Sequence, residues 1–249
     1  MHYQMWIWSK FENVIAHFLI AMMEELIILY YVLFYMFLLM YYHYNNIISY
    51  KEVAYMGKIK LLHGSDHIIE KPDLLLGKTN NDYGRGFYCT QELSMAMEWA
   101  CKKNSDGFVN KYVLEQDSLN ILNLLDGKYN ILHWMALLLK NRTFRLSNEI
   151  AIDACDYIIE NFSIDLKAYD VIIGYRADDS YFSFAESFVQ NGLPLRSLNE
   201  ALHLGRLGTQ TVLISEKSFR NLTFDGADFA DKTVYYPKFI ARDSNVRET

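Results

Sequence analysis

Residues 61–90, "LLHGSDHIIEKPDLLLGKTNNDYGRGFYCT", decide the fold, because they begin and end as strands with a polar, glycine-containing segment between them. His63 ends the first apolar strand, and Gly64 follows it without a side chain, so that a ligand could approach the backbone there. Ser65 offers a hydroxyl at the same place. Two interpretations follow: the wall of a nucleotide pocket, or two strands joined by a polar loop.

The second half of this stretch, "YGRGFYCT", predicts a strand that sets one aromatic side chain apart. Because side chains alternate along a strand, Phe87 and Cys89 face one way and Tyr88 faces the other. The sequence "QELSMAMEWA" continues directly as a helix, with Thr90 as a candidate N-cap, and returns Trp99 toward the end of the strand. Tyr88 and Trp99 are therefore expected to form two faces of a clamp.

Such a clamp suits a flat, electron-poor ring. Aromatic faces favour stacking, and a positively charged ring such as nicotinamide is attracted further by the aromatic quadrupole. The carboxamide of that ring needs a backbone N–H and a hydroxyl, which Gly64 and Ser65 can supply. These residues make nicotinamide a candidate ligand.

The whole chain has 249 residues and 51% hydrophobic content, enough for a packed core. After Met56 the order of strands and helices is mixed, which predicts an α+β domain over residues 56–249. The expected strands cover 58–63, 86–90, 107–114, 171–174 and 211–215, and the expected helices cover 92–102, 130–140, 148–161, 181–190 and 197–204.

Charge and cysteine content exclude several classes of function. A formal charge of −6, from 24 Lys and Arg against 30 Asp and Glu, gives no general attraction to nucleic acid, so a protein is favoured as the macromolecular partner. Three scattered cysteines predict no disulfide framework and a reducing compartment, the cytoplasm. The chain has no CxxC pair, no cluster of His and Cys residues offers tetrahedral metal ligands, and no GxSxG motif of a serine hydrolase is present. Cys89 lies on the strand face opposite Tyr88 beside bulky neighbours, so it is expected to be a buried thiol rather than a nucleophile.

Residues 1–55 differ from the rest in their long apolar and aromatic runs. Residues 26–42 carry no charged side chain and reach the short limit of about 17 residues for a membrane-spanning helix. Three interpretations stay open: a hydrophobic helical segment that contacts a membrane, an extension upstream of a natural start at Met56, or a buried helix of the main fold. No small-residue cleavage site follows, so a cleaved signal peptide is disfavoured.

The order "HGS", "YGRGFY" and an aromatic residue eleven positions after the tyrosine resembles the NAD-binding core of ADP-ribosyltransferases of the diphtheria-toxin and poly(ADP-ribose) polymerase branch. Together with "DVIIGYRADDSYF" and "LGRLGTQTVLISEKSF", the opening stretch is also similar to an uncharacterised bacterial domain family assigned to this fold. Its members often sit beside a small antitoxin-like gene. The resemblance covers most of residues 57–226 and implies a split β-sheet with flanking helices.

The resemblance implies roles for the matching residues. His63 would bond the nicotinamide ribose or the diphosphate side of NAD, Gly64 would pair with the carboxamide, and Tyr88 would stack on nicotinamide. Trp99 falls where the second stacking aromatic is expected. Arg85 and Arg176 each either meet the diphosphate or serve a structural contact.

The sequence departs from the family at Gln210, where polymerase-like enzymes carry glutamate. A carboxylate binds a ribose hydroxyl and opposes the positive charge of an oxocarbenium-like state, and glutamine can do only the first. At about 4 Å and an effective dielectric near 20, a unit charge is worth roughly 4 kcal/mol, on the order of a thousandfold in rate. Asp178 and Asp179 are candidate substitutes, or equally the N-cap of the following helix.

The sequence therefore predicts an NAD-dependent mono-ADP-ribosyltransferase without a metal. It would modify an unknown macromolecule and could be the toxin of a toxin-antitoxin pair, with a small antitoxin as partner. A catalytically silent module that binds NAD or ADP-ribose, with residues 1–55 as a candidate membrane contact, is the alternative that Gln210 favours. A structural protein without a nucleotide site is the third interpretation.

Overall fold

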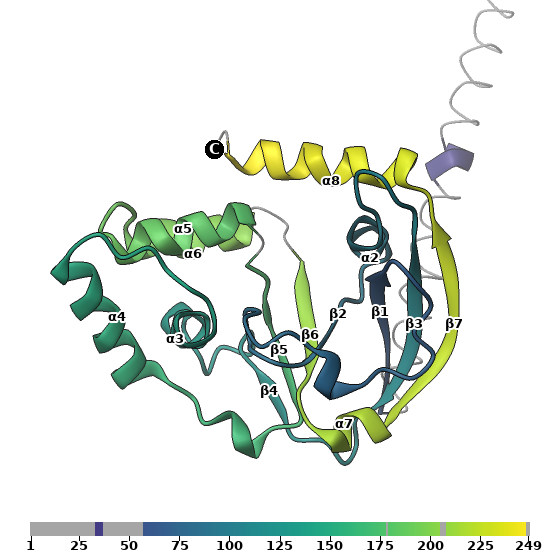
Figure 1. Cartoon of the computed structure of the whole chain (residues 1–249), viewed down its shortest axis with the longest axis horizontal. Coiled ribbons are helices and arrows are strands. Elements are labelled where there is room, and N and C mark those ends of the chain that lie inside the picture. The colour runs from purple at the N-terminus through teal and green to yellow at the C-terminus, as the bar shows by residue number, and fades with distance from the viewer. Residues whose placement is uncertain (1–32, 37–56, 178, 205–207, 248–249) are drawn as a thin grey trace, which may run out of the picture. The chain divides into compact units, whose positions relative to one another are not determined.

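A computed structural model describes residues 33–36, 57–177, 179–204 and 208–247 (Figure 1). Contacts divide the chain between Met56 and Gly57, close to the change in composition. Residues 33–36 are helical with exposed side chains, and the remainder of the hydrophobic helix expected over 26–42 lies outside the described residues. Within the described ranges, no helix has both the length and the apolar character needed to cross a membrane.

Residues 57–247 build two sheets, within the part of the chain that the structure describes. The first contains β1 (Lys58–Ser65), β3 (Gly107–Glu115) and β7 (Leu222–Ala230) in the order β1-β3-β7, all antiparallel. The second has the order β2-β6-β5-β4, with bounds Phe87–Cys89, Thr209–Leu213, Val171–Tyr175 and Ile121–Asn123. Within it, β4 and β5 are parallel and the other pairs antiparallel.

The two sheets touch between the second half of β1 and the residue that follows β2. Leu62 and Thr90 form an antiparallel bridge, with N–H to O distances of 2.8 and 2.9 Å in the two directions. This bridge brings the end of β1, and with it His63, next to β2. The quoted stretch thus joins the two sheets.

Helices cover the two sheets separately (Figure 1). Those packed near the first sheet are α2 (Leu93–Ala100) and α8 (Lys232–Arg247), and they are joined by an ion pair between Glu98 and Arg242 at 2.7 Å. The remaining elements are α3 (Ile131–Asn141), α4 (Glu149–Phe162), α5 (Asp179–Val189), α6 (Leu195–Leu204), α7 (Glu216–Arg220) and the 3-10 turns η1 (Leu74–Leu76) and η2 (Leu166–Ala168).

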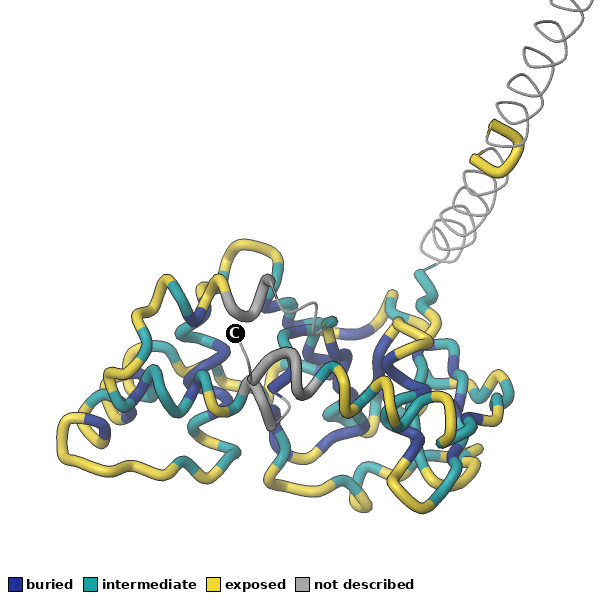
Figure 2. Tube along the Cα trace, turned by 90° about the horizontal axis from the view of Figure 1, so that it is seen from above, coloured by how far each residue is buried: buried dark blue, intermediate teal, exposed yellow. Residues whose placement is uncertain are grey.

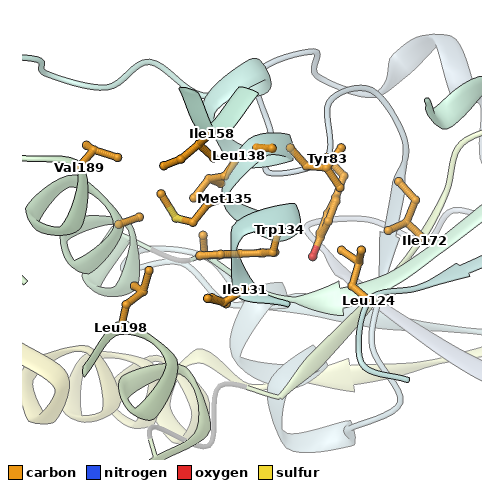
Figure 3. Close-up of a cluster of buried hydrophobic side chains, with 14 of the residues drawn as sticks. Tyr83, Leu124, Ile131, Trp134, Met135, Leu138, Ile158, Ile172, Val189 and Leu198 are labelled. Atoms are coloured by element: carbon orange, nitrogen blue, oxygen red, sulfur yellow. The ribbon is translucent and has the colours of Figure 1, made fainter. Parts of the chain in front are cut away.

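The largest core cluster is centred on α3, whose Trp134, Met135 and Leu138 are almost fully buried (Figure 3). Ile158 from α4 and Ile172 from β5 belong to the same cluster, so α3 connects a covering helix to the second sheet. Asn130 starts this helix by accepting a hydrogen bond from Leu132 N–H, an ordinary N-cap. This cluster holds the strands that carry the candidate site.

Two smaller clusters of buried side chains lie between other elements. Figure 2 shows how buried and exposed segments alternate along the chain. One places Leu61, Cys89 and Tyr112 between β1, β2 and β3. The other packs Ala96 and Ala100 of α2 against the first sheet. Small side chains on α2 let this helix lie close to β1.

The predicted α+β class is confirmed, with two sheets and flanking helices. The expected strands correspond to β1, β2, β3, β5 and β6, and the expected helices to α2–α6. The prediction missed β4, β7, α7 and α8. It also gave α2 the wrong start, because the helix begins after Glu92 and the Thr90 hydroxyl accepts from Glu92 N–H without capping it.

Gly64 is required by the packing of α2 on β1. A Cβ at this position would overlap the Ala96 carbonyl oxygen and lie 2.6 Å from Ala100 N and 2.8 Å from Trp99 Cβ. Because two of these atoms are helix backbone, we expect Gly64→Ala to lower the free energy of unfolding by about 2 to 3 kcal/mol. Unfolding of the full chain in denaturant measures this loss of free energy.

Gly127→Ala is the matched control for this prediction. Gly127 has φ +83° and nothing within 4 Å of a Cβ, so alanine there tests backbone strain alone, at about 1 kcal/mol. A Gly64→Ala protein as stable as the wild type would contradict the close contact of α2 and β1.

Candidate functional site

A cavity of about 680 Å³ opens where the two sheets meet. Its size falls in the usual range for small-molecule and cofactor sites. Its walls come from β1, β2, α2 and β6, from the loop that joins β1 to β2, and from the segments that follow α3 and β5. The lining includes His63, Tyr88, Trp99, Arg176 and Gln210, which the sequence assigned to one site.

His63 lies within β1, two residues before its end, and its ring has a fixed orientation. Its Nδ1 lies 2.7 Å from the Tyr88 carbonyl oxygen, which can only accept, so Nδ1 carries the proton. Burial lowers the pKa of His63, and the neutral ring therefore keeps Nε2 as a hydrogen-bond acceptor. The ring also packs on Phe87 at 4.4 Å between centroids. A neutral acceptor of this kind suits a hydroxyl.

Tyr88 lines the cavity, and its hydroxyl is hydrogen-bonded within the protein. The hydroxyl donates to Gly84 O at 2.7 Å and accepts from Tyr83 N–H at 3.0 Å. Burial raises the pKa of Tyr88, so the phenol stays protonated and does not act as a base at neutral pH. The two hydrogen bonds hold the Tyr88 side chain in one orientation.

Gln210, the second residue of β6, is 3% exposed and lines the cavity. Its Nε2 donates to Asp82 Oδ2 at 3.0 Å and to the Tyr175 carbonyl oxygen at 3.1 Å. Two acceptors around one nitrogen decide the orientation of the amide, because a flipped amide would place its oxygen against both. The position that the sequence singled out thus carries an ordered amide.

Asp82 is a carboxylate in the cavity lining to which the sequence analysis gave no role. Besides Gln210, it accepts from Arg142 Nη1 and from Ala177 N–H, both at 2.9 Å. Burial raises its pKa, while these hydrogen bonds and the charges of Arg142 and Arg176 oppose the rise. Asp82 connects the β1–β2 loop, the end of α3, the end of β5 and β6 at one point.

Trp99 and Arg176 pack on each other in the cavity wall. The Arg176 guanidinium carbon lies 4.9 Å from the Trp99 ring centroid, a cation–π contact. Arg176 therefore covers one face of the indole, and a clamp between Tyr88 and the other face of Trp99 stays a prediction. Trp99 Nε1 is buried and has no hydrogen-bond partner among the described residues.

Gly64, Ser65 and Arg85 are not among the described residues that line the cavity. The Ser65 hydroxyl donates to His67 O and accepts from Asn110 Nδ2 at 2.8 Å, so it holds the loop after β1. Arg85 Nη1 donates to Leu75 O at 3.3 Å, a contact within the β1–β2 loop. Ser65 and Arg85 thus have hydrogen bonds within the protein, and the contacts of Gly64, Ser65 and Arg85 to nicotinamide or diphosphate stay predictions.

The two candidate substitutes for the missing glutamate are only partly described. Asp178 lies outside the described residues, and Asp179 is the first residue of α5. Cys89 is fully buried, and burial raises the pKa of its thiol, as expected for a core cysteine. Among the described residues, no group of three or more His, Cys, Asp or Glu side chains is placed to hold a metal ion.

Asp82, Arg142 and Phe239 line the cavity and were missed from the sequence. Arg142 and Phe239 reach it from the end of α3 and from α8, a helix that was not predicted. A signal for Asp82 did exist, because it lies next to the "YGRG" segment that was used to locate Tyr88. An acidic residue directly before a glycine-containing segment of the site is itself a candidate site residue.

A family model described as a protein of unknown function (DUF3990) matches residues 59–224. The chain belongs to the DUF3990 family. The match extends from β1 into β7 and therefore contains His63, Asp82, Tyr88 and Gln210, while Phe239 on α8 lies beyond it. No curated protein matches the chain.

Proposed function

We propose that this DUF3990 domain is an NAD-dependent mono-ADP-ribosyltransferase of the diphtheria-toxin and poly(ADP-ribose) polymerase type. One observation carries the proposal: His63, Tyr88, Trp99 and Gln210, which lie on four separate elements, line the same cavity. These four residues are among those that the sequence predicts for an NAD site. Two sheets that meet at the cavity are compatible with the split sheet of such enzymes.

The lining residues suit the parts of NAD. The Tyr88 ring supplies a flat, fixed surface for nicotinamide, and Nε2 of the neutral His63 accepts from a ribose hydroxyl. Arg176, with Lys71 and Lys78 from the β1–β2 loop, places positive charge in the lining for a diphosphate. The unpartnered Trp99 Nε1 is a further donor for a bound ligand.

In the proposed reaction the bond between nicotinamide and C1′ of the ribose breaks, and its electron pair leaves with neutral nicotinamide. A nucleophilic atom of the acceptor forms a new bond to C1′ and releases its proton. Gln210 binds a ribose hydroxyl while positive charge develops on the ring, and the walls of the cavity restrict water. The products are nicotinamide, a proton and the ADP-ribosylated acceptor.

A protein is the acceptor class that we propose. Leu75 and Leu76 of η1 are 72% and 84% exposed, and Leu76 lines the cavity. Two apolar side chains at the edge of a cavity favour contact with a protein surface more than with nucleic acid, in keeping with the net charge of −6. We also propose that the protein is the toxin of a toxin-antitoxin pair and that a small antitoxin restrains it. This part of the proposal rests on the sequence resemblance alone.

The second candidate is a binding module that holds NAD or ADP-ribose without catalysis. Its support is the neutral side chain at Gln210, because an amide adds no charge to oppose an oxocarbenium ion. Both candidates require the cavity to bind NAD. They differ in whether nicotinamide is released.

Nicotinamide release and transfer of labelled ADP-ribose to proteins of a lysate test the proposal. We expect His63→Ala and Tyr88→Ala each to lower both by about a hundredfold, since one loses a ribose contact and the other the stacking surface. Tyr88→Phe keeps the ring and loses only the bonds of the hydroxyl to Gly84 and Tyr83, so it separates stacking from positioning. Thermal unfolding of each variant verifies that it is folded.

The outcomes separate the candidates. NAD binding without nicotinamide release in the wild type supports the binding module. Loss of release in His63→Ala and Tyr88→Ala at unchanged folding supports the enzyme. A wild-type protein whose melting temperature does not respond to millimolar NAD or ADP-ribose contradicts both.

A further inference from the structure

Asp82 holds a rigid place beside Gln210 in the cavity lining. Its Oδ1 accepts from Arg142, and its Oδ2 accepts from both Ala177 N–H and Gln210 Nε2. Three donors from three other segments of the chain leave the carboxylate little rotational freedom. Asp82 is therefore a fixed acceptor rather than a mobile charge.

A glutamine needs such an acceptor if it is to replace a glutamate. Both carboxylate oxygens of a glutamate can accept a hydroxyl proton, whereas only one end of a glutamine amide can do so. In this structure Asp82 takes one N–H of Gln210 and the Tyr175 carbonyl takes the other. Because Nε2 is the end of the amide that faces these two acceptors, Oε1 is the end that can accept from a ligand.

We propose that Asp82 is a positioning residue for Gln210, which it holds with Oε1 as the acceptor for a ribose hydroxyl of the NAD donor. The identity of this hydroxyl rests on the proposed function. The orientation of the amide rests only on the contacts of Asp82, Tyr175 and Gln210.

The bond to a charged acceptor also changes the amide itself. Hydrogen bonds in a chain polarise one another, so an N–H that donates to a carboxylate increases the negative charge on the amide oxygen. Gln210 Oε1 is therefore a stronger acceptor. This contributes most in the transition state, because the ribose hydroxyl is more acidic there. Loss of this effect is expected in kcat rather than in KM.

Two substitutions at Asp82 separate positioning from charge. Asp82→Ala removes the acceptor of Gln210. Asp82→Asn removes the charge but can keep an oxygen toward Ala177 and Gln210. Its NH2 group then faces Arg142, whose side chain is 24% exposed and can turn to solvent. We expect kcat for nicotinamide release to fall at least about thirtyfold in Asp82→Ala and less than about fivefold in Asp82→Asn, with KM changed little in both.

Asp170→Asn is the matched control. Asp170 is 9% exposed against 6% for Asp82, and it accepts from Asn120 N–H and the Ser215 hydroxyl. It lies outside the cavity lining, so its loss is expected to lower the melting temperature without changing kcat.

A second measurement does not depend on NAD. In protein labelled with 15N-glutamine, the side-chain NH2 of Gln210 is assigned by its loss in Gln210→Leu, and its hydrogen exchange is compared with that of the exposed Gln91. We expect exchange at Gln210 to be slow in the wild type and in Asp82→Asn, and at least about tenfold faster in Asp82→Ala.

Equal loss of kcat in Asp82→Ala and Asp82→Asn would overturn the proposal, because charge alone would then be the contribution of Asp82. Rapid exchange at Gln210 in the wild type, or exchange that Asp82→Ala leaves unchanged, would overturn it too. A wild type that neither binds NAD nor releases nicotinamide removes the proposed function instead, and the exchange rates alone then decide whether Asp82 orients Gln210.

Discussion

Gln210→Glu is expected to destabilise the protein at neutral pH, although the resemblance to glutamate-containing enzymes would suggest a repair. The new carboxylate would stand where Gln210 Nε2 now lies 3.0 Å from Asp82 Oδ2. Two ionised carboxylates about 3 Å apart repel by roughly 5 kcal/mol at an effective dielectric near 20. One of the two must therefore take up a proton or the structure must move.

Protonation sets an upper limit to this cost. A glutamic acid with an unperturbed pKa of about 4.3 can be protonated at pH 7 for about 3.7 kcal/mol, after which its O–H can donate to Asp82. We therefore expect a loss of about 3 to 4 kcal/mol at pH 7, or a melting temperature lowered by about 6 to 16 °C for a protein of this size. The introduced side chain carries no charge once it is protonated, so no gain in nicotinamide release is expected at neutral pH.

The pH dependence identifies the cause. Burial already raises the pKa of Asp82, and a second carboxyl raises the pKa of the pair further. A carboxyl whose folded pKa is raised contributes its full stability below the unfolded pKa and loses it as pH rises. The difference between Gln210→Glu and wild type should thus be small near pH 4 and grow up to pH 7 in thermal unfolding.

Gln190→Glu is the matched control, because Gln190 bonds Arg145 O and Ser147 on the surface and has no carboxylate among these partners. Its melting temperature is expected to follow that of the wild type across this pH range. A Gln210→Glu protein that is as stable as wild type at pH 7 and more active would contradict the ionised state of Asp82.

Asn110→Ala is expected to release the loop that follows β1. Asn110 on β3 is completely buried, and its Nδ2 donates to the Ser65 hydroxyl at 2.8 Å and to His67 O at 3.2 Å. Its Oδ1 accepts from Ile69 N–H at 2.7 Å. Alanine leaves these polar groups without partners, and each unpaired group costs about 1 to 3 kcal/mol where water does not reach it. We therefore expect the free energy of unfolding to fall by about 3 kcal/mol in total.

Unfolding in denaturant and limited proteolysis measure this effect. Because His67 and Ile69 line the cavity, cleavage should appear between residues 66 and 73, and NAD binding should weaken with it. Asn120→Ala is the control, since the Asn120 side chain donates one exposed hydrogen bond to Ala168 O. Resistance of the loop to protease in Asn110→Ala would show that Asn110 does not anchor it.

Sequence reasoning located the strands and helices with regular apolar patterns and missed those without them. In β7, Asp225, Gly226 and Asp228 interrupt the apolar alternation, and the strand forms one edge of the first sheet. Helix α8 has a polar composition and contains Pro237, so it lacks the apolar period of the other helices. Strand β4 spans three residues, too short for a periodic signal.

The site residues also divide into those that a local sequence pattern predicts and those whose contacts join distant parts of the chain. His63 and Tyr88 lie in one continuous stretch whose spacing is visible in the sequence. Asp82 bonds partners that are 60, 95 and 128 residues away, and no local pattern announces such contacts. The bond between Ser65 and Asn110 likewise joins residues 45 positions apart, and no local pattern in the sequence predicts it.

The position of Phe239 on α8 has a consequence during synthesis. The cavity wall starts with His63 near the beginning of the domain and includes Phe239 close to its end, and α8 is joined to α2 through Glu98 and Arg242. Domains emerge from the ribosome from the N-terminus onward. A nascent chain that has not yet released α8 lacks one wall of the cleft, so α8 must leave the ribosome before the pocket can close around any ligand.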